Sequence, residues 1–362
     1  MKSEPLDIVI IGLTITSSWG NGHATTYRGL VRELTRLGHR VLFLEQNVEW
    51  YASNRDMPKP PFGTTRLYRN FGDLKNRFEG EVRGADVVII GSYVADGIAV
   101  GEWARRINDQ IVAFYDIDTP VTLAKLRQGT NDYLSRELIA KYDLYLSFTG
   151  GPTLELLEEK FGSSMARPLY CSFDPEIYYP EKPAIAWDLG YMGTYSDDRQ
   201  PTVNWLLLEP ARRAPKLKFA VAGPQYPASI RWPKNVRRIN HLAPREHRKF
   251  YNAQRFTLNV TRRDMIEAGY SPSVRLFEAA ACGTPIISDY WEGLDEFFKL
   301  DDEILIARSP EETLKFLELD EPERKKIGER ARRRVMCEHT AAHRAVELEG
   351  YLLELAGREA MA

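Results

Sequence analysis

The chain begins with a pattern of four parts: a short continuous apolar run, a loop, an amphipathic helix and a second apolar run. The first run spans residues 8–11 and ends in Gly12, as expected of a strand buried on both faces of a parallel sheet. Apolar residues then recur at helical spacing from Tyr27 to Leu37, and Gly38 stands where a C-terminal cap belongs. Residues 41–44 supply the next run, so this pattern predicts a βαβ unit.

Further apolar runs continue the pattern in two series. The runs are residues 87–90, 111–115 and 144–147, and then residues 189–192, 219–222, 256–260 and 285–288. A proline-punctuated stretch separates the two series, and a length of 362 residues favours two domains of about 150–200 residues each. We therefore expect an α/β protein with two Rossmann-like domains whose parallel sheets face each other across a cleft.

The domain boundaries follow from this division. We expect an N-terminal domain at residues 1–168, a C-terminal domain at residues 169–337 and a final helix at residues 338–362. That helix carries Ala345, Leu348, Leu352 and Leu355 on one face, so it must dock on a domain, and the N-terminal domain is a plausible platform.

Composition excludes several classes of protein. The net charge of −2 gives no sign of a nucleic-acid partner, and three widely spaced cysteines argue against disulfides and thiolate zinc sites. The first apolar run is too short for a signal sequence or a membrane span. We expect a cytoplasmic protein without a transmembrane segment, and peripheral membrane association and oligomeric state stay open.

The segment at residues 269–288 carries the strongest chemical signal. It reads GYSPSVRLFEAAACGTPIIS, and Ser271 followed by Pro272 is typical of a helix start. Helical spacing aligns Ser271, Arg275 and Glu278 on one polar face. The helix start, with Ser271, Ser273 and Arg275, suits a diphosphate, and Glu278 one turn later suits two ribose hydroxyls. The alternative is an ordinary surface ion pair between Arg275 and Glu278.

This segment resembles the nucleotide-sugar motif of retaining GT-B glycosyltransferases, in which a glutamate precedes small residues, a glycine and a proline. Glu278 matches that glutamate. The sequence SPSVRLFEAAACGTPIISDYWEGLDEFF more closely resembles the spore-maturation-type (CgeB-like) glycosyltransferases, and this resemblance extends over most of the chain. The resemblance implies a GT-B-like fold, a nucleotide-diphosphate sugar donor and no required metal or other cofactor. One departure is Tyr270, which stands where the two-glutamate families have another glutamate, and we expect Tyr270 to contact the donor at that position.

The second domain opens with a strand, a small-residue turn at Gly193 and then Arg199 before a helix start at Pro201. Such a turn lets a phosphate approach, and Arg199 would stabilise the departing β-phosphate. Arg262 is a weaker candidate for the same role. The alternative for Arg199 is a surface pair with Asp197 or Asp198.

The loop between the first strand and the first helix holds Gly20, Gly22 and His23. We expect the two glycines to contact the donor, and we expect the helix start to lower the pKa of His23 so that a neutral imidazole serves as base or donor. Asp116, at a strand end, would orient His23 or bind sugar hydroxyls. The alternatives are that His23 has a structural role and that Asp118 caps the helix that follows it.

These residues leave three functions open. The first is sugar transfer from a nucleotide-diphosphate donor to a glycan, a protein or a small metabolite, with His23, Asp116 and Arg199 catalytic. The glutamate motif favours retention, and inversion would make His23 the base. The second is an NAD(P)-dependent oxidoreductase, motivated by Gly20, Gly22 and Glu45, which lies near the expected ribose position. The third is a sugar-nucleotide epimerase or a two-lobed binding protein.

Overall fold

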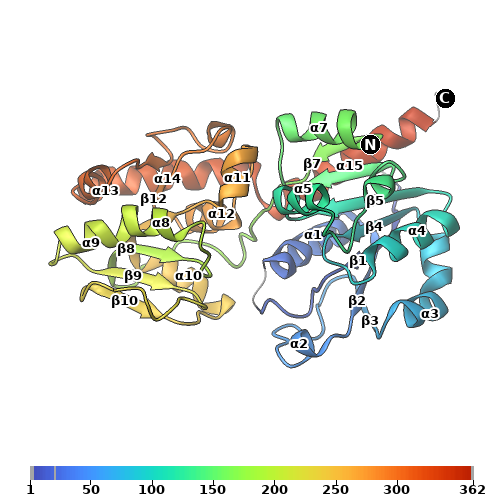
Figure 1. The fold of residues 1–362 in the computed structure, drawn as a ribbon, viewed down its shortest axis with the longest axis horizontal. Coiled ribbons are helices and arrows are strands. Elements are labelled where there is room, and N and C mark those ends of the chain that lie inside the picture. The colour runs from blue at the N-terminus through green and yellow to red at the C-terminus, as the bar shows by residue number, and fades with distance from the viewer. Residues whose placement is uncertain (1–3, 20–21, 360–362) are drawn as a thin grey trace. The chain divides into compact units, whose positions relative to one another are not determined.

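The structure is a computed structural model that describes residues 4–19 and 22–359 (Figure 1). It divides into two units, the first comprising Met1–Cys171 with Ala341–Ala362 and the second comprising Ser172–Thr340. Both boundaries fall a few residues later than the sequence suggested. Leu169 extends the first unit because it packs into that unit's core. His339 extends the second because its ring stacks on Phe277, 4.7 Å between centroids.

The first unit is built on a sheet of seven strands in the order β3-β2-β1-β4-β5-β6-β7. Every neighbouring pair is parallel. The strands are β1 (Asp7–Gly12), β2 (Arg40–Gln46), β3 (Thr64–Tyr68), β4 (Val87–Gly91), β5 (Ile111–Asp116), β6 (Leu144–Ser147) and β7 (Ala166–Pro168).

Helices cover both faces of this sheet, which explains why its strands read as continuous apolar runs. The helices are α1 (His23–Leu37), α2 (Glu49–Ala52), α3 (Phe71–Gly84), α4 (Gly97–Ile107), α5 (Thr119–Gln128), α6 (Arg136–Ile139), α7 (Pro152–Phe161) and α15 (Ala341–Glu359). Val9 and Ile11 pack with α3 and α4 on one face, whereas Ile8 and Ile10 pack with α1 and α15 on the other. The final helix is therefore part of the first unit's core.

The second unit has a sheet of six parallel strands in the order β10-β9-β8-β11-β12-β13. The strands are β8 (Trp187–Met192), β9 (Phe219–Ala222), β10 (Val236–Ile239), β11 (Gln254–Asn259), β12 (Ile286–Ser288) and β13 (Leu305–Ile306).

The helices of the second unit again lie on both faces of the sheet. They are α8 (Gln200–Val203), a π-helical segment (Asn204–Leu208), α9 (Glu209–Arg213), α10 (Pro244–Asn252), α11 (Arg263–Ala268), α12 (Val274–Ala281), a short 3-10 helix (Leu294–Glu296), α13 (Pro310–Leu317) and α14 (Glu321–Glu338). Leu189 and Tyr191 pack toward the helices from Val203 to Ala211 and toward α13 and α14. Ala220 and Ala222, on the opposite face, pack with Phe250 of α10.

Each sheet contains a point where the strand order reverses. In the first unit the chain runs outward from β1 through β2 to β3, and then returns to the other side of β1 with β4. In the second unit β8 has the same position, between β9 and β11. Open α/β sheets bind ligands outside the carboxyl ends of the strands at such a switch point. The two places to examine are therefore the ends of β1 and β4 and the ends of β8 and β11.

Candidate functional site

Arg275 joins the two strand ends at the switch point of the second unit. Its side chain donates to the carbonyl oxygen of Met192 at 3.0 Å, at the end of β8, and to that of Val260 at 3.2 Å, just after β11. The guanidinium also lies over the ring of Tyr191, with 5.8 Å from Cζ to the centroid. A fixed positive charge therefore stands at the place where this fold class binds its ligand.

Two glycines at this point leave the backbone without side chains. The amide of Gly193 donates to the carbonyl of Ala222 at 2.9 Å, which joins the ends of β8 and β9. A Cβ at Gly223 would lie 2.0 Å from the carbonyl oxygen of Gly193, and the φ of 143° at Gly223 disfavours any other residue. A Cβ at Gly193 would lie 2.8 Å from Arg275 Nη1. Side chains here would exclude both the turn and the close approach of a ligand.

Arg199 supplies a second cation to the same region. It is the N-cap residue of α8, and its guanidinium donates to Ser196 Oγ at 2.9 Å and to the carbonyl of Thr194 at 2.6 Å. Burial lowers the pKa of Arg199, and the nearby positive charge of Arg275 lowers it further. The protein thus holds two guanidinium groups close enough to repel each other, an arrangement that an anion would relieve.

The surface ion pair weighed for Arg199 does not form among the described residues. Asp197 accepts instead from the phenol of Tyr195 at 2.5 Å, and Asp198 accepts from the backbone amide of Arg263 at 3.0 Å. Asp198 also lies 3.9 Å from Arg262 Nε.

Arg262 completes a group of three cations, which we call the arginine cluster: Arg199, Arg262 and Arg275. Its positive charge also acts on Arg199. The Nε atoms of Arg262 and Arg275 are buried, and no described residue accepts a hydrogen bond from them. Buried donors are normally satisfied, so these two atoms leave hydrogen-bonding capacity that the described residues do not use.

The helix beside the cluster begins later than the sequence indicated. We expected Ser271 as N-cap and Pro272 as first residue, but α12 starts at Val274 with Ser273 as N-cap. The residues before Val274 cannot join the helix because Ser273 has an extended backbone, with φ −88° and ψ 146°. Ser273 makes no side-chain cap, and its hydroxyl donates to Asn259 Oδ1 at 3.0 Å. The amide end of α12 therefore has no side-chain cap from its own N-cap residue.

The other two predicted donor residues in this segment have different environments. Ser271 is buried, with 2% of its surface exposed. Tyr270 is half-buried, its amide donates to the carbonyl of Glu292 at 2.7 Å, and its ring lies against Gly293. The structure thus gathers Arg199, Arg262, Arg275 and the start of α12 around the carboxyl ends of β8 and β11.

Glu278 differs most from its expected environment. It was expected on a polar helix face, but it is 4% exposed and accepts a hydrogen bond from the phenol of Tyr251 at 3.1 Å. Burial raises the pKa of Glu278 to about 7, against the opposing effects of Tyr178, Tyr251 and Arg275. The surface ion pair between Arg275 and Glu278 is therefore excluded as well, since Arg275 binds backbone carbonyls and Glu278 binds phenols.

In the first unit, His23 is the first residue of α1, beside the switch point at β1. Its pKa is lowered to about 4, and the cause is burial. The direction agrees with the expectation, although the helix end was the reason expected. No described residue hydrogen-bonds to the buried Nδ1, and the ring packs edge-on against Tyr93 at 5.4 Å. His23 therefore stays neutral at pH 7.

Asp116 does not orient His23, which corrects the expectation for that residue. It is fully buried at the end of β5, where it accepts from Tyr145 at 2.6 Å and Thr122 at 2.7 Å. Burial raises the pKa of Asp116 to about 6. The hydrogen-bond partners of Asp116, Tyr145 and Thr122, both belong to the interior of the first unit. Asp116 braces the strand end instead.

Tyr93 contacts His23, and the sequence did not reveal this contact. Tyr93 has a positive φ of 63°, and its hydroxyl donates to Asp118 Oδ2 at 2.8 Å. Asp118 is the N-cap of α5, as expected, but its side chain makes no cap. A positive φ at a non-glycine residue is a feature that is common at functional sites, and only the structure reveals it.

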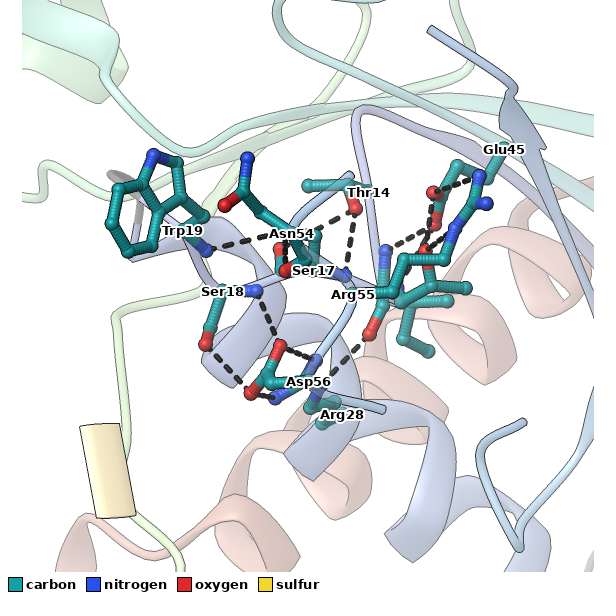
Figure 2. Close-up of polar contacts among 11 residues, drawn as sticks. Thr14, Ser17, Ser18, Trp19, Arg28, Glu45, Asn54, Arg55 and Asp56 are labelled. Atoms are coloured by element: carbon teal, nitrogen blue, oxygen red, sulfur yellow. Dashed lines mark hydrogen bonds and ion pairs between the residues drawn. The ribbon is translucent and has the colours of Figure 1, made fainter. Parts of the chain in front are cut away.

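Figure 2 shows how the loop before His23 is held. The carboxylate of Glu45 accepts from the amides of Ile15 at 2.7 Å and Thr16 at 2.9 Å, and from the Thr16 hydroxyl at 2.6 Å. Glu45 is fully buried, and its carboxylate already accepts these three hydrogen bonds. This arrangement argues against the ribose-binding role that motivated an NAD(P)-dependent oxidoreductase. Gly22 is exposed and is the N-cap of α1, whereas Gly20 lies outside the described residues.

A second carboxylate clamps the same loop (Figure 2). Asp56 accepts from the amide of Ser18 at 2.8 Å and from its hydroxyl at 2.8 Å, and it forms a bidentate pair with Arg28 at 2.9 Å. Arg28 and Ser18 lower the pKa of Asp56 to about 2, against burial that raises it. The described part of the loop, up to Trp19, is therefore rigidly anchored.

The described residues contain no group of three or more His, Cys, Asp or Glu side chains that could hold a metal ion. Cys171 and Cys282 are buried free thiols and Cys337 is an exposed one. In the described part of the chain, every helix is too short or too polar to span a membrane.

Part of the chain matches a known protein family. Residues 199–350 match the model of a family described as glycosyl transferase-like. This segment begins at Arg199 and contains Arg262, Arg275 and Glu278. No curated protein matches the chain.

Solved structures share the fold at low sequence identity. A sucrose-phosphate synthase from Thermosynechococcus elongatus has a TM-score of 0.69 at 13% identity, over 97% of this chain and 100% of that chain. HepE of Anabaena, solved with UDP and glucose, has a TM-score of 0.70 at 12% identity, over 96% of this chain and 100% of that chain. An alpha-glucosyltransferase solved with UDP has a TM-score of 0.72 at 13% identity, with 96% and 100% covered.

The chain is a glycosyltransferase with the GT-B fold. Its two Rossmann-like α/β units confirm the predicted fold class. Within this glycosyltransferase the matched family segment includes the arginine cluster, whereas His23 and the loop of Figure 2 lie outside it.

Proposed function

We propose that this glycosyltransferase takes its sugar from a nucleotide-diphosphate donor bound on the second unit. The observation that carries the proposal is the arginine cluster at the carboxyl ends of β8 and β11. Among the described residues, Arg199 and Arg275 donate only to uncharged oxygens, so no protein carboxylate occupies the guanidinium donors that an anionic ligand would use. A diphosphate carries the required charge, and guanidinium groups bind phosphate oxygens in a bidentate manner.

The chemistry of the step follows from where these charges stand. The bond between the anomeric carbon and the β-phosphate oxygen breaks, and a new bond forms from that carbon to an acceptor hydroxyl. Negative charge develops on the departing diphosphate, and fixed guanidinium groups stabilise it without reorganisation. In the retaining course, which the glutamate motif favours, that diphosphate receives the acceptor proton on the same face of the sugar.

The arginine cluster also supports a reaction without a metal ion. Three guanidinium groups supply the positive charge that a divalent cation provides in other phosphate chemistry. The expected result is transfer activity that persists in excess EDTA. Loss of activity in EDTA, restored by one divalent cation, would contradict this part of the proposal.

The remaining assignments are Glu278 for the ribose and the first unit for the acceptor. Glu278 lies one helical turn beyond Arg275 on α12, which matches the distance from a diphosphate to its ribose. The neutral His23 imidazole, with one buried nitrogen lacking a partner, would contact the acceptor hydroxyl. The closer resemblance to CgeB-like enzymes and the retaining course remain part of this proposal.

The test is a thermal-shift panel of UDP, GDP, ADP, their sugar conjugates and NAD(P). A ligand at about 100 times its Kd stabilises the folded protein by about 2.7 kcal/mol. We expect stabilisation by one class of nucleoside diphosphate and by its sugar conjugates. Stabilisation by NAD(P) alone would overturn the proposal in favour of an oxidoreductase, and the internal bonds of Glu45 argue against that outcome.

A further inference from the structure

The carboxyl group of Glu278 lies between two tyrosines that come from different parts of the second unit. Tyr251 lies in the last turn of α10, and its phenol donates to Glu278 Oε2 at 3.1 Å. The phenol of Tyr178, in the segment before β8, acts on the same carboxyl and lowers its pKa. The two rings pack edge to face at 6.5 Å between centroids, with an interplanar angle of 61°.

Both tyrosines are themselves held in place. The backbone carbonyl of Tyr251 accepts from the Thr284 hydroxyl at 2.9 Å, which ties α10 to the turn after α12. Asn252 donates to the carbonyl of Tyr179 at 3.1 Å, which ties the end of α10 to the segment that carries Tyr178. The phenols are 3% exposed or less, so their orientation is set by packing.

A carboxylate has more hydrogen-bonding capacity than these two phenols use. Each oxygen offers two lone-pair directions, about four in all, and two phenol donors can occupy at most about two of them. The remaining capacity matches the two hydroxyls of a ribose. A buried carboxylate without such donors would also lose its charge easily, because burial favours the neutral form.

We infer that Tyr178 and Tyr251 are positioning residues, which hold the Glu278 carboxyl in place and keep it charged so that it accepts both ribose hydroxyls of the donor. This inference rests on the proposed function and names the residues through which one part of the donor site works.

Other titratable groups around Glu278 are few. Arg275, one turn earlier on α12, lowers the pKa of Glu278, as both phenols do. The pKa of the Cys282 thiol is raised by burial and by the charge of Glu278. Arg248 and Glu181, an ion pair at 2.9 Å, act on Cys282 with opposite signs. With the pKa of Glu278 raised to about 7, the two phenols and Arg275 determine how much carboxylate exists at neutral pH.

The experiment compares UDP with 2′-deoxy-UDP, and GDP with 2′-deoxy-GDP, by titration calorimetry from about pH 5.5 to about pH 9. The members of each pair carry the same phosphates, so the ratio of their dissociation constants isolates the 2′-hydroxyl from phosphate titration. For the wild-type protein we expect a ratio of about ten or more at high pH, because the hydroxyl donates to a charged acceptor. The ratio should approach one as Glu278 is protonated, with a midpoint near pH 7.

The variants Tyr251→Phe and Tyr178→Phe should each move that midpoint to higher pH by about one unit, since each removes a phenol that favours the charged form. Glu278→Gln should give a ratio that does not change with pH. The matched control is Tyr142→Phe, which removes an equally buried phenol hydroxyl from the first unit and should leave the midpoint unchanged.

The outcomes separate this inference from the proposed function. If neither UDP nor GDP binds the wild-type protein, the donor site itself fails. If a nucleotide binds but the phenylalanine variants keep the wild-type midpoint, or the wild-type ratio is independent of pH, the role of the tyrosines is refuted. A carbon-13 NMR titration of labelled glutamate gives the Glu278 pKa directly, and the same pKa in the wild-type protein and in Tyr251→Phe would refute it as well.

Discussion

Replacing Arg199 with methionine tests whether the arginine cluster serves a ligand or the fold. The substitution removes two hydrogen bonds, to Ser196 Oγ and to the Thr194 carbonyl, each worth about 1 kcal/mol. It also removes a buried charge that lies close to Arg275, whose charge disfavours it. These effects oppose each other, so we expect the free energy of unfolding of the unliganded protein to change by less than about 1 kcal/mol.

The effect on nucleotide binding should be much larger. A hydrogen bond between a guanidinium and a phosphate contributes about 1.5–3 kcal/mol, so Arg199→Met should raise the Kd for UDP or GDP by about 10- to 150-fold. Urea unfolding of the unliganded protein measures the first quantity, and titration calorimetry measures the second.

Arg255 offers a matched control on the opposite edge of the same sheet. It donates to Asp188 at 3.0 Å and to the carbonyl of Leu319 at 3.1 Å, near the amino ends of β8 and β11. Arg255→Met leaves Asp188 without its cation, so it should lower stability by about 1–3 kcal/mol and leave nucleotide affinity unchanged. If Arg199→Met behaves like Arg255→Met, destabilising the protein without weakening nucleotide binding, the reasoning is wrong.

Three further predictions concern the first unit. The folded pKa of His23, about 4, lies below its unfolded value of about 6.5. The contribution of His23 to the free energy of unfolding should therefore be complete above pH 6.5 and should be lost as the pH drops toward 4. Denaturation at several pH values should show a smaller loss in His23→Gln, and equal pH slopes of the unfolding free energy in both proteins would count against the buried neutral imidazole. Glu45→Gln weakens three hydrogen bonds to Ile15 and Thr16 and should cost about 2 kcal/mol of unfolding free energy, whereas an unchanged urea midpoint would contradict the clamp. Leu348→Ala opens a cavity where α15 packs on the sheet and should cost about 2–5 kcal/mol; a loss below 1 kcal/mol would mean that α15 is not part of this core.

The central strands could be predicted from sequence because they are buried on both faces and appear as continuous apolar runs. All nine predicted runs form strands, among them β1, β5 and β9. The missed strands are short or lie at sheet edges, where polar residues are tolerated: β3 reads TTRLY, β10 reads VRRI, and β7 and β13 have three and two residues. Local patterning carries little information about such strands, since neighbouring strands supply most of their contacts.

The site could be predicted only where one segment builds it. Arg275 and the motif glutamate stand at their expected spacing on one helix. The environment of Glu278 could not be predicted because Tyr178 and Tyr251 reach it from other segments, and spacing within α12 cannot report them. The same reason explains the error at Asp116, whose partners Thr122 and Tyr145 turn it inward, and the omission of Tyr93 beside His23.

A crystal structure of the protein soaked with UDP or GDP tests the central claim most directly. We predict density for the diphosphate against Arg199, Arg275 and the Gly193 turn, with the ribose hydroxyls on Glu278. Nucleotide bound at another surface, with the arginine cluster unoccupied, would contradict the account.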